Sequence, residues 1–253
     1  MLSGAFYSLN LTRRDAIFIL IGREQSALMK LARRGTMKFL LTSAGISNPS
    51  IRNALIDLLG KPIATSTALF IPTAAHSIPD GPSEVWRQTR TWVELGWKAF
   101  GVLELTALPG ILQEHWLPQL EAADALLVGG GEHLYLCYWA WQSGLANLLP
   151  SLLQHTVYVG ASAGSMLVTK TFGEHYDGVN PPAGSDRALG LVNFTLYPHL
   201  EAEYAPHATL ENMEKWAAGV DVPAYAIDDQ TALKVIDGEV SVVSEGQWKR
   251  FTP

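Results

Sequence analysis

A chain of 253 residues and 27.6 kDa, with 48% apolar residues, is long enough for one large domain with a sizeable core. The net charge of -6 and the isoelectric point near 5.6 exclude the strongly basic surface typical of proteins that bind nucleic acid or an anionic membrane. The single cysteine, Cys137, excludes an intrachain disulfide and offers no metal-ligand spacing. We therefore expect a cytoplasmic protein that acts on small molecules or peptides and uses neither metal nor cofactor.

The first 36 residues differ in composition from the rest of the chain. Arginines are crowded there around a short apolar run, Ala16 to Gly22, which is too short to span a bilayer. The pair Arg13-Arg14 is reminiscent of a twin-arginine export signal, but no small-residue cleavage site follows it. We expect residues 1–36 to form a helical or flexible extension and residues 37–253 to form a single domain.

From residue 38 onward, apolar strand-like runs alternate with helical stretches. This alternation predicts an α/β fold with a doubly wound, mostly parallel sheet and helices on both of its faces. The expected strands are 38–42, 68–73, 99–105, 125–130, 156–161 and 224–228. The expected helices lie near 48–59, 82–96, 110–121, 133–147, 163–170 and 208–218. The C-terminal tail predicts a hairpin that turns at Asp237-Gly238, followed by a further short strand.

The pentapeptide Gly160-Ala161-Ser162-Ala163-Gly164 joins an apolar run to a helix-compatible run. A G-x-S-x-G turn needs small residues, because the serine backbone is strained and the flanking chain passes close to its neighbours. Such a nucleophile elbow holds the Ser162 hydroxyl out of the fold. The helix that follows points backbone N–H groups and its positive dipole end at an oxyanion formed there. A motif of this kind also occurs in simple glycine-rich connections, so the surrounding sequence must show whether Ser162 is catalytic.

Two further glycine-bearing turns follow predicted strands, at residues 42–45 and 128–132. Ligands of open α/β sheets bind beyond the carboxyl ends of the strands, so these turns are expected beside the elbow. Successive glycines let the backbone approach a reacting carbonyl, and the N–H groups of Gly130 and Ala163 are the expected oxyanion hole. A dinucleotide loop is the rival interpretation of the glycine run, but the G-x-G-x-x-G spacing is missing.

A serine hydroxyl needs a base, and histidine is the side chain whose pKa suits that task. His199 is the strongest candidate, because Pro198 presets an extended entry and a strand-like run delivers it; His207 and His175 are its rivals. A carboxylate must then orient the imidazole. Asp177, in a loop after the nucleophile helix, is the first candidate, and the alternatives are Asp228, Asp229 and Glu201.

These motifs resemble peptidase E, the aspartyl dipeptidases, and their serine-peptidase relatives, which include cyanophycinases. The resemblance runs from about Met37 to the end of the chain and is carried by LTSAG (41–45), FIPTA (70–74), LLVGGG (126–131), VGASAGS (159–165), YPHL (197–200) and IDDQTAL (227–233). It implies a glutamine amidotransferase-like three-layer sandwich. It also implies Ser162 as nucleophile, His199 as general base and Asp177 as relay acid. Some relatives use a downstream glutamate instead, and this sequence has Asp228 and Asp229 in that region.

Two positions depart from the family pattern. The family's glycine turn commonly continues with Asn-Thr, whereas Glu132 and His133 follow the glycines here. We expect Gly129, Gly131, Glu132 and His133 to contact substrate, with the Glu132 carboxylate holding an N-terminal ammonium. The run after Pro198-His199 contains no arginine, so a preference for an N-terminal aspartate needs a cation from elsewhere, such as Arg187.

The sequence therefore predicts a serine-type hydrolase that cleaves small peptides as a dipeptidase or exopeptidase, with Asp-X peptides among the candidate substrates. We expect a monomer or a homodimer. An α/β esterase-like hydrolase is an alternative, although Asp177 follows Ser162 by only 15 residues and no His-Gly-Gly-Gly motif is present. The other alternative is a catalytically inactive homologue that binds a peptide or a small molecule.

Overall fold

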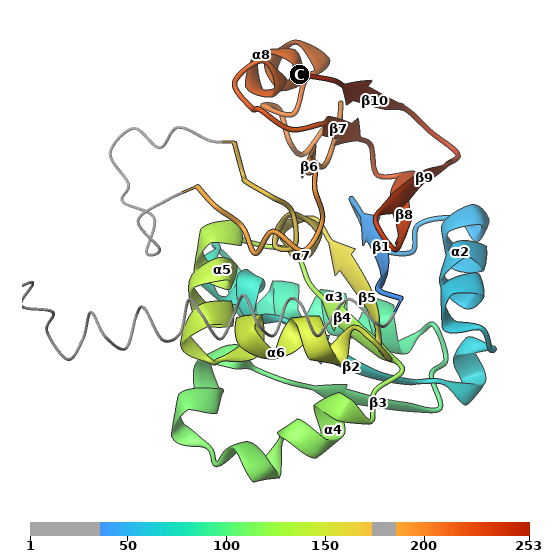
Figure 1. Ribbon diagram of the computed structural model, residues 1–253, viewed down its shortest axis with the longest axis vertical. Helices are drawn as coiled ribbons and strands as arrows, with labels where there is room; N and C mark the ends of the chain where they lie inside the picture. The colour runs from blue at the N-terminus through green and yellow to red at the C-terminus, as the bar shows by residue number, and fades with distance from the viewer. Residues whose placement is uncertain (1–35, 174–185) are drawn as a thin grey trace, which may run out of the picture. The chain divides into compact units, whose positions relative to one another are not determined.

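A seven-stranded sheet is the centre of the fold (Figure 1). The computed structural model describes residues 36–173 and 186–253, so the predicted extension lies, except for Thr36, outside the described residues. The sheet order is β3-β2-β4-β5-β1-β8-β9, with β1 to β5 mutually parallel where they pair and β8 antiparallel to β1. The strands are β1 (Lys38–Thr42), β2 (Thr67–Ile71), β3 (Ala99–Val102), β4 (Ala125–Val128), β5 (Val157–Ala161), β8 (Thr231–Ile236) and β9 (Glu239–Ser244).

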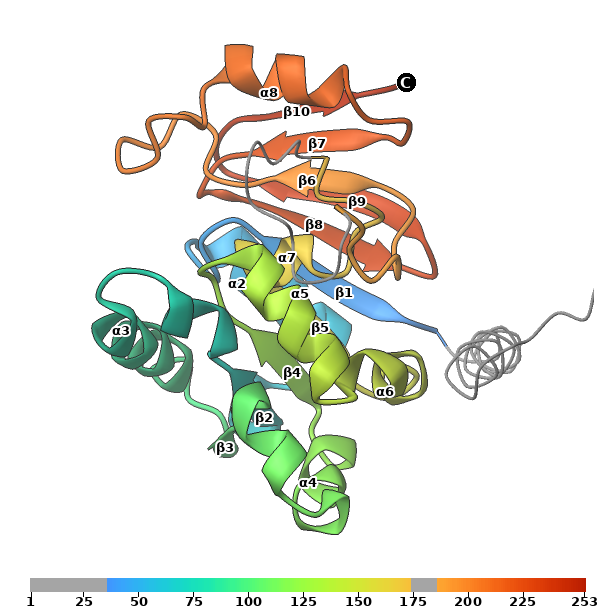
Figure 2. The ribbon, with the colours of Figure 1, turned by 90° about the vertical axis from the view of Figure 1, so that its left-hand side faces the viewer.

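Helices cover both faces of this sheet, as the turned view in Figure 2 shows. Alternate residues of a strand point to opposite faces: Leu40 packs with α2 (Pro49–Leu59) and α3 (Gly81–Val93), whereas Phe39 and Leu41 belong to the core under the other helices. Those other helices are α4 (Leu117–Glu121), α5 (His133–Gln142), α6 (Leu145–Leu152) and α7 (Ala163–Met166). The predicted three-layer α/β fold with a mostly parallel sheet is confirmed.

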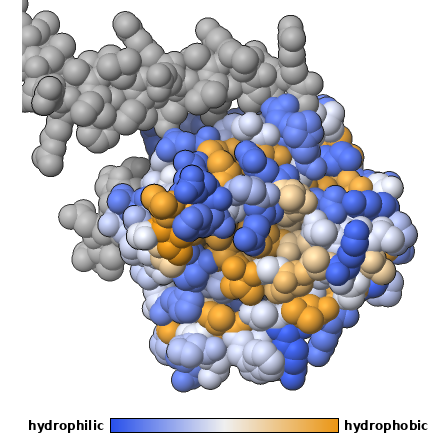
Figure 3. Space-filling view, turned by 90° about the horizontal axis from the view of Figure 1, so that it is seen from below, coloured by the Kyte–Doolittle hydropathy of each residue, from blue (hydrophilic) through white to orange (hydrophobic). Residues whose placement is uncertain are grey.

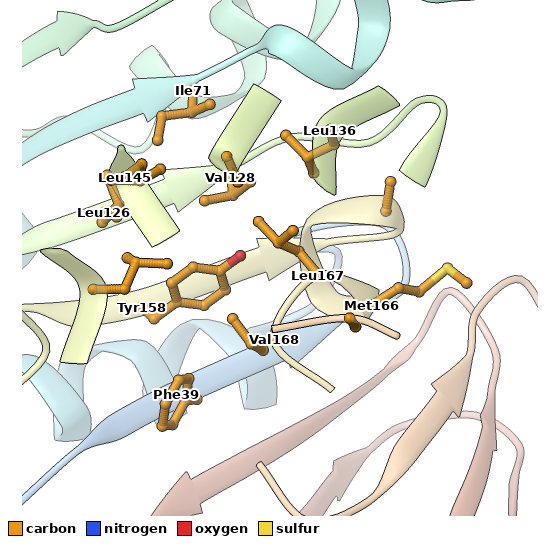
Figure 4. Close-up of a cluster of buried hydrophobic side chains, with 14 of the residues drawn as sticks. Phe39, Ile71, Leu126, Val128, Leu136, Leu145, Tyr158, Met166, Leu167 and Val168 are labelled. Carbon is orange, nitrogen blue, oxygen red and sulfur yellow. The ribbon is translucent and has the colours of Figure 1, made fainter. Parts of the chain in front are cut away.

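The larger core lies between the sheet and α5, α6 and α7 (Figure 4). Its side chains from the main sheet come from alternate positions of five neighbouring strands, and Phe39 and Tyr158 make a tilted aromatic pair at 5.8 Å. The buried Tyr158 hydroxyl donates a hydrogen bond of 2.6 Å to the carbonyl of Gly164. A buried phenol needs such a partner. This bond ties the core of the sheet to the turn that carries Ser162.

A second, three-stranded sheet has the order β10-β7-β6 and packs with α8 (Leu210–Ala217). Its strands are β6 (Thr195–Tyr197), β7 (Ala224–Ile227) and β10 (Trp248–Phe251). The predicted strand at 224–228 therefore belongs to this smaller sheet and not to the main one, because a short apolar run does not reveal its pairing partner. The predicted hairpin between β8 and β9 is confirmed, and both turn residues, Asp237 and Gly238, have positive φ.

Three helical predictions were too long. The segment predicted as a helix at 110–121 forms short 3-10 turns before α4, and the one at 133–147 is divided at Gly144, whose φ is 81°. The helix after the elbow ends at Met166 and not near residue 170. A helix dipole grows with the number of aligned peptides, so the single turn of α7 contributes less to an oxyanion than the sequence implied.

The surface carries apolar residues in separate patches among polar ones, on the face drawn in Figure 3. Large exposed apolar side chains include Val102 at the end of the edge strand β3, and Ile111 and Leu112 in the turns that follow. Within the described residues, no helix combines the length and the hydropathy needed to cross a bilayer.

The tight packing around Gly164 generates a testable prediction. A Cβ at this position would lie 2.1 Å from the carbonyl oxygen of Val128, so the backbone of β4 or of the elbow would have to move. Helix propensity alone predicts that Gly164→Ala stabilises α7. We expect the opposite, a loss of about 1–3 kcal/mol in the free energy of unfolding, measured by urea denaturation.

Gly110→Ala is the matched control, because nothing lies within 4 Å of a Cβ at Gly110. It should unfold at the urea concentration of the unmodified protein. A Gly164→Ala protein as stable as this control would contradict the packing argument.

Candidate active site

The nucleophile elbow adopts the strained turn that its sequence predicts. Ser162 has φ 51° and ψ -116°, and its N–H donates a 3.0 Å hydrogen bond to the carbonyl of Thr42 at the end of β1. The same carbonyl accepts a bond of 2.7 Å from the Ser165 hydroxyl. A Cβ at Gly160 would lie 2.6 Å from Cα of Ser165, so only glycine fits there. Positive φ in a serine costs energy that the surrounding contacts must offset.

The His199 ring lies beside this serine. His199 follows β6 and Pro198, and its own φ is 64°, which turns the chain sharply at the imidazole. Its Nε2 atom is 2.8 Å from the Ser162 hydroxyl oxygen, within hydrogen-bond reach of a base and a nucleophile. Its backbone N–H donates a 2.8 Å bond to the hydroxyl of Ser43, just beyond β1. The turns after β1, β5 and β6 thus meet at one point.

Asp229 contacts the opposite side of the imidazole. Its Oδ1 atom is 2.8 Å from Nδ1 of His199 and accepts a 2.6 Å bond from the Ser43 hydroxyl, while Oδ2 accepts a bond from the Tyr204 hydroxyl. Burial on its own would raise the pKa of Asp229. The hydrogen bonds from His199, Ser43 and Tyr204 outweigh that effect and lower the pKa to about 2. The carboxylate is therefore ionised at neutral pH.

The other candidate acids and bases from the sequence either lie outside the described residues or have other partners. Asp177 and His175 lie outside the described residues. The Asp228 carboxylate accepts bonds from the backbone of Gln230 and Gln247 and from the Thr231 hydroxyl, so it holds the turns around β8 and β10. Glu201 accepts a bond from the N–H of Leu210, before α8. Neither side chain contacts His199 in the structure, and His207 is not among the described residues that line the cavity beside Ser162.

Close packing explains the run of three glycines after β4. A Cβ on Gly129 would lie 2.2 Å from Oε1 of Gln88, and one on Gly131 would lie 2.2 Å from the carbonyl oxygen of Ala74. At Gly130 the nearest atom would be Cβ of Ser162, at 3.1 Å. The glycines therefore let the backbone of this turn pass close to Ser162, as the sequence predicts.

The two predicted oxyanion donors have different surroundings. The Gly130 N–H donates a 3.1 Å bond to Oε1 of Gln88 on α3, and Nε2 of the same side chain donates a 3.1 Å bond to the Gly130 carbonyl. Ala163 is the first residue of α7, so its N–H has no carbonyl partner within the helix. An oxyanion that is to reach the Gly130 N–H must therefore displace the Gln88 oxygen.

Glu132 and His133, which the sequence predicts to contact substrate, make other contacts in the structure. The Glu132 carboxylate accepts bonds from the N–H groups of Leu134 and Tyr135 and so caps α5. The His133 ring packs edge-on against Phe172 at 4.7 Å. Neither residue lines the cavity beside Ser162. The expectation that Glu132 holds a substrate ammonium thus lacks support from its position, because its oxygens face the helix end.

A cavity of about 570 Å³ opens beside Ser162, and α3 forms one of its walls. Arg87 and Glu84 on that helix form an ion pair at its rim. Arg187, the cation considered from the sequence, is exposed and does not line the cavity. No cluster of three or more metal-ligating side chains occurs within residues 36–173 and 186–253. The described residues that line the cavity include Ser43, Gly45, Glu84, Arg87, Gln88, Gly130, Gly131, Ser162, His199, Tyr204 and Asp229.

The sequence indicated some of this arrangement and missed other parts. Ser43 lies in one of the three turns singled out after a strand, but nothing in the turn predicted its two bonds to the histidine and the acid. Tyr204 lies in a run noticed only for its lack of arginine. Arg87 and Gln88 belong to a helix whose orientation no motif reveals. All four are brought to the site by tertiary packing.

Sequence comparison places the site in a known context. The model of peptidase family S51 matches residues 39–243. The chain is 29% identical to the peptidase E of Streptomyces coelicolor over 135 residues, which is 50% of this chain and 54% of that protein. It is 28% identical to the probable alpha-aspartyl dipeptidase of Drosophila melanogaster over 199 residues, 76% of this chain and 78% of the relative. The match thus spans only about half the length of the Streptomyces protein.

Solved structures share the fold at low sequence identity. A protein of Listeria monocytogenes EGD-e assigned to peptidase E superposes with a TM-score of 0.65 at 18% identity, over 83% of this chain and all of the other. A peptidase from an acI-B1 Actinobacterium gives 0.56 at 19% identity, over 86% and 95% of the two chains. These likenesses support the fold alone. The family match covers most of the chain and includes all three strand-end turns, so the chain belongs to peptidase family S51, which confirms the resemblance to peptidase E.

Proposed function

We propose that this protein is a serine-type peptidase that hydrolyses small peptides through a Ser162–His199–Asp229 triad. One observation carries the proposal: Nε2 of His199 lies 2.8 Å from the Ser162 hydroxyl, and Nδ1 of the same ring lies 2.8 Å from the Asp229 carboxylate. A base hydrogen-bonded to the nucleophile and oriented by a carboxylate on its other nitrogen is the arrangement that activates a serine. Membership of family S51 agrees with it.

In this mechanism Nε2 of His199 takes the Ser162 proton while the hydroxyl oxygen attacks the peptide carbonyl. The ionised Asp229 stabilises the imidazolium, which then protonates the leaving amine. A water molecule activated by His199 hydrolyses the acyl-enzyme and frees Ser162. The oxyanion accepts bonds from the Ala163 N–H and from the Gly130 N–H once the Gln88 oxygen has withdrawn.

The identity of the acid is the first test of this mechanism. Ser162→Ala should lose essentially all dipeptidase turnover, since it removes the nucleophile. Asp229→Asn should lower kcat by roughly 10⁴-fold, because an amide cannot stabilise the imidazolium and favours the wrong tautomer. Asp177→Asn, which changes the acid first favoured from the sequence, should keep kcat within a few-fold of the unmodified protein. Steady-state kinetics on dipeptides measure all three variants.

Labelling with a fluorophosphonate is the control for a catalytically inactive homologue. The unmodified protein should be labelled at Ser162, since only an activated serine reacts readily, and Ser162→Ala should not be labelled. Full turnover in pure Ser162→Ala protein, or a collapse of kcat in Asp177→Asn with none in Asp229→Asn, contradicts the triad proposed here.

The charges on α3 suggest which peptides fit. A guanidinium has five N–H donors, and the Arg87 contact with Glu84 engages one of its nitrogens. Arg87 lines the cavity and is exposed at its rim, so it is available to a carboxylate on the substrate. The segment after His199 contains no arginine to pair with an acidic substrate residue. We therefore propose that Arg87 supplies this cation, and that peptides with N-terminal aspartate are among the substrates.

Substitution of Arg87 tests this specificity. Arg87→Gln should reduce kcat/KM for an Asp-X dipeptide roughly tenfold relative to an Ala-X dipeptide, because a charged hydrogen bond to the aspartate is lost. Arg90→Gln is the matched control: Arg90 is on the same helix, is paired with Glu94 and does not line the cavity. An Asp-X to Ala-X ratio that is equal in the two variants rules out Arg87 as the specificity residue.

A further inference from the structure

The second oxygen of the Asp229 carboxylate has its own donor. Oδ1 accepts bonds from His199 and Ser43, whereas Oδ2 accepts its only hydrogen bond within the described part of the chain from Tyr204. A carboxylate held at one oxygen can rotate about its Cβ–Cγ bond. Donors at both oxygens fix its plane, and with it the direction of the lone pair that faces His199.

Tyr204 reaches this position from a loop closed by its own backbone. The N–H of Glu201 donates to the carbonyl of Ala208, and the N–H of Ala202 donates to the carbonyl of His199. The Tyr204 ring lies 5.3 Å from the His199 ring at an interplanar angle of 66°. The residue is nevertheless 66% exposed and lines the cavity. Its hydroxyl thus contacts the acid while much of its ring remains open to solvent.

The Tyr204 hydroxyl also limits which nitrogen of the neutral imidazole carries the hydrogen. Burial, followed by the neighbouring Asp229, raises the pKa of Tyr204 well above its usual range, and the charge of Arg87 on α3 opposes this only in part. The phenol therefore keeps its proton and donates it to Asp229. Its oxygen lies 2.8 Å from Nδ1 of His199, and it has no second proton to offer there. The Ser43 hydroxyl lies 3.1 Å from the same nitrogen and likewise donates its proton to Asp229. Because neither hydroxyl has a proton left for Nδ1, this nitrogen carries its own hydrogen and donates it to Asp229, which leaves Nε2 as the acceptor for the Ser162 proton.

We propose that Tyr204 is a positioning residue that orients the Asp229 carboxylate and thereby fixes the His199 tautomer in which Nε2 is the base. The proposal rests on the triad proposed above. In this role the hydroxyl affects turnover through Asp229 and takes no direct part in the chemical steps. Ser43 is the buried counterpart on the other oxygen and holds both Asp229 and the backbone of His199.

Tyr204→Phe separates the hydroxyl from the ring. We expect kcat to fall roughly tenfold, as for the loss of one hydrogen bond to a charged group, with KM within twofold, because the ring still lines the cavity. The Asp229 carboxyl should titrate at a higher pH than about 2 once this donor is gone. The measurement is a ¹³C chemical-shift titration of the Asp229 carboxyl carbon, assigned by its loss in Asp229→Asn. Tyr138→Phe on α5, away from the cavity, is the matched control and should change neither quantity.

The titration separates a failure of this proposal from a failure of the proposed function. Tyr204→Phe overturns the positioning role if its kcat equals that of the control, or if kcat falls while the Asp229 titration stays unchanged. A rise in KM with kcat unchanged also overturns it, because that result would indicate a contact between the hydroxyl and the substrate. Turnover that persists in Ser162→Ala rejects the triad, but it leaves the Asp229 titration as a direct reading of the Tyr204 bond.

Discussion

The arrangement of the site depends on one imidazole ring held between a hydroxyl and a carboxylate. Ser162 follows β5, His199 follows β6 and Asp229 precedes β8, so three separate parts of the chain must agree to within a hydrogen-bond length. Two of the three residues meet this demand with strained backbones, φ 51° at Ser162 and φ 64° at His199. Strain of this kind persists only where the surroundings over-determine the conformation. Here the backbone N–H of each strained residue is bonded to the turn at the end of β1, through Thr42 and Ser43.

The turn after β1 is consequently as important as the elbow. β1 lies between β5 and β8, so its carboxyl end is adjacent to the elbow on one side and close to Asp229 on the other. The Thr42 carbonyl accepts the bonds that fix the elbow, and the Ser43 hydroxyl links His199 to Asp229. A mixed sheet, with an antiparallel strand beside a parallel one, is what brings an acid near the carboxyl end of β5.

The sequence predicted what local patterns encode. Apolar alternation and strand-end turns gave the layers of the sheet, and the small residues around Ser162 gave the elbow, because steric demands there are local. Local patterns do not identify the carboxylate that pairs with His199. Asp177, Asp228 and Asp229 all occur in suitable loops, and their distances from His199 depend on the folded chain. Asp228 and Asp229 are neighbours, yet one holds a turn and the other contacts the imidazole. The places of Gln88 and Arg87 beside the cavity could not be predicted for a similar reason: whether a polar helix residue faces solvent or a cavity depends on how the helix packs.

The residues around Ser162 and the charges at the cavity rim belong to different structural elements. Gly160 and Gly164, on either side of Ser162, belong to a tightly packed strand end, where a single added Cβ would collide with backbone. The charges at the cavity rim belong to α3, and the Tyr204 ring belongs to an exposed loop; neither position is confined by the sheet. Substitution of Arg87 on α3 therefore alters the charge at the cavity without removing a contact among Ser162, His199 and Asp229. Tyr204 differs from the α3 residues, because its hydroxyl donates to Asp229 while its ring lines the cavity, so a change there alters both the surroundings of that carboxylate and the shape of the cavity.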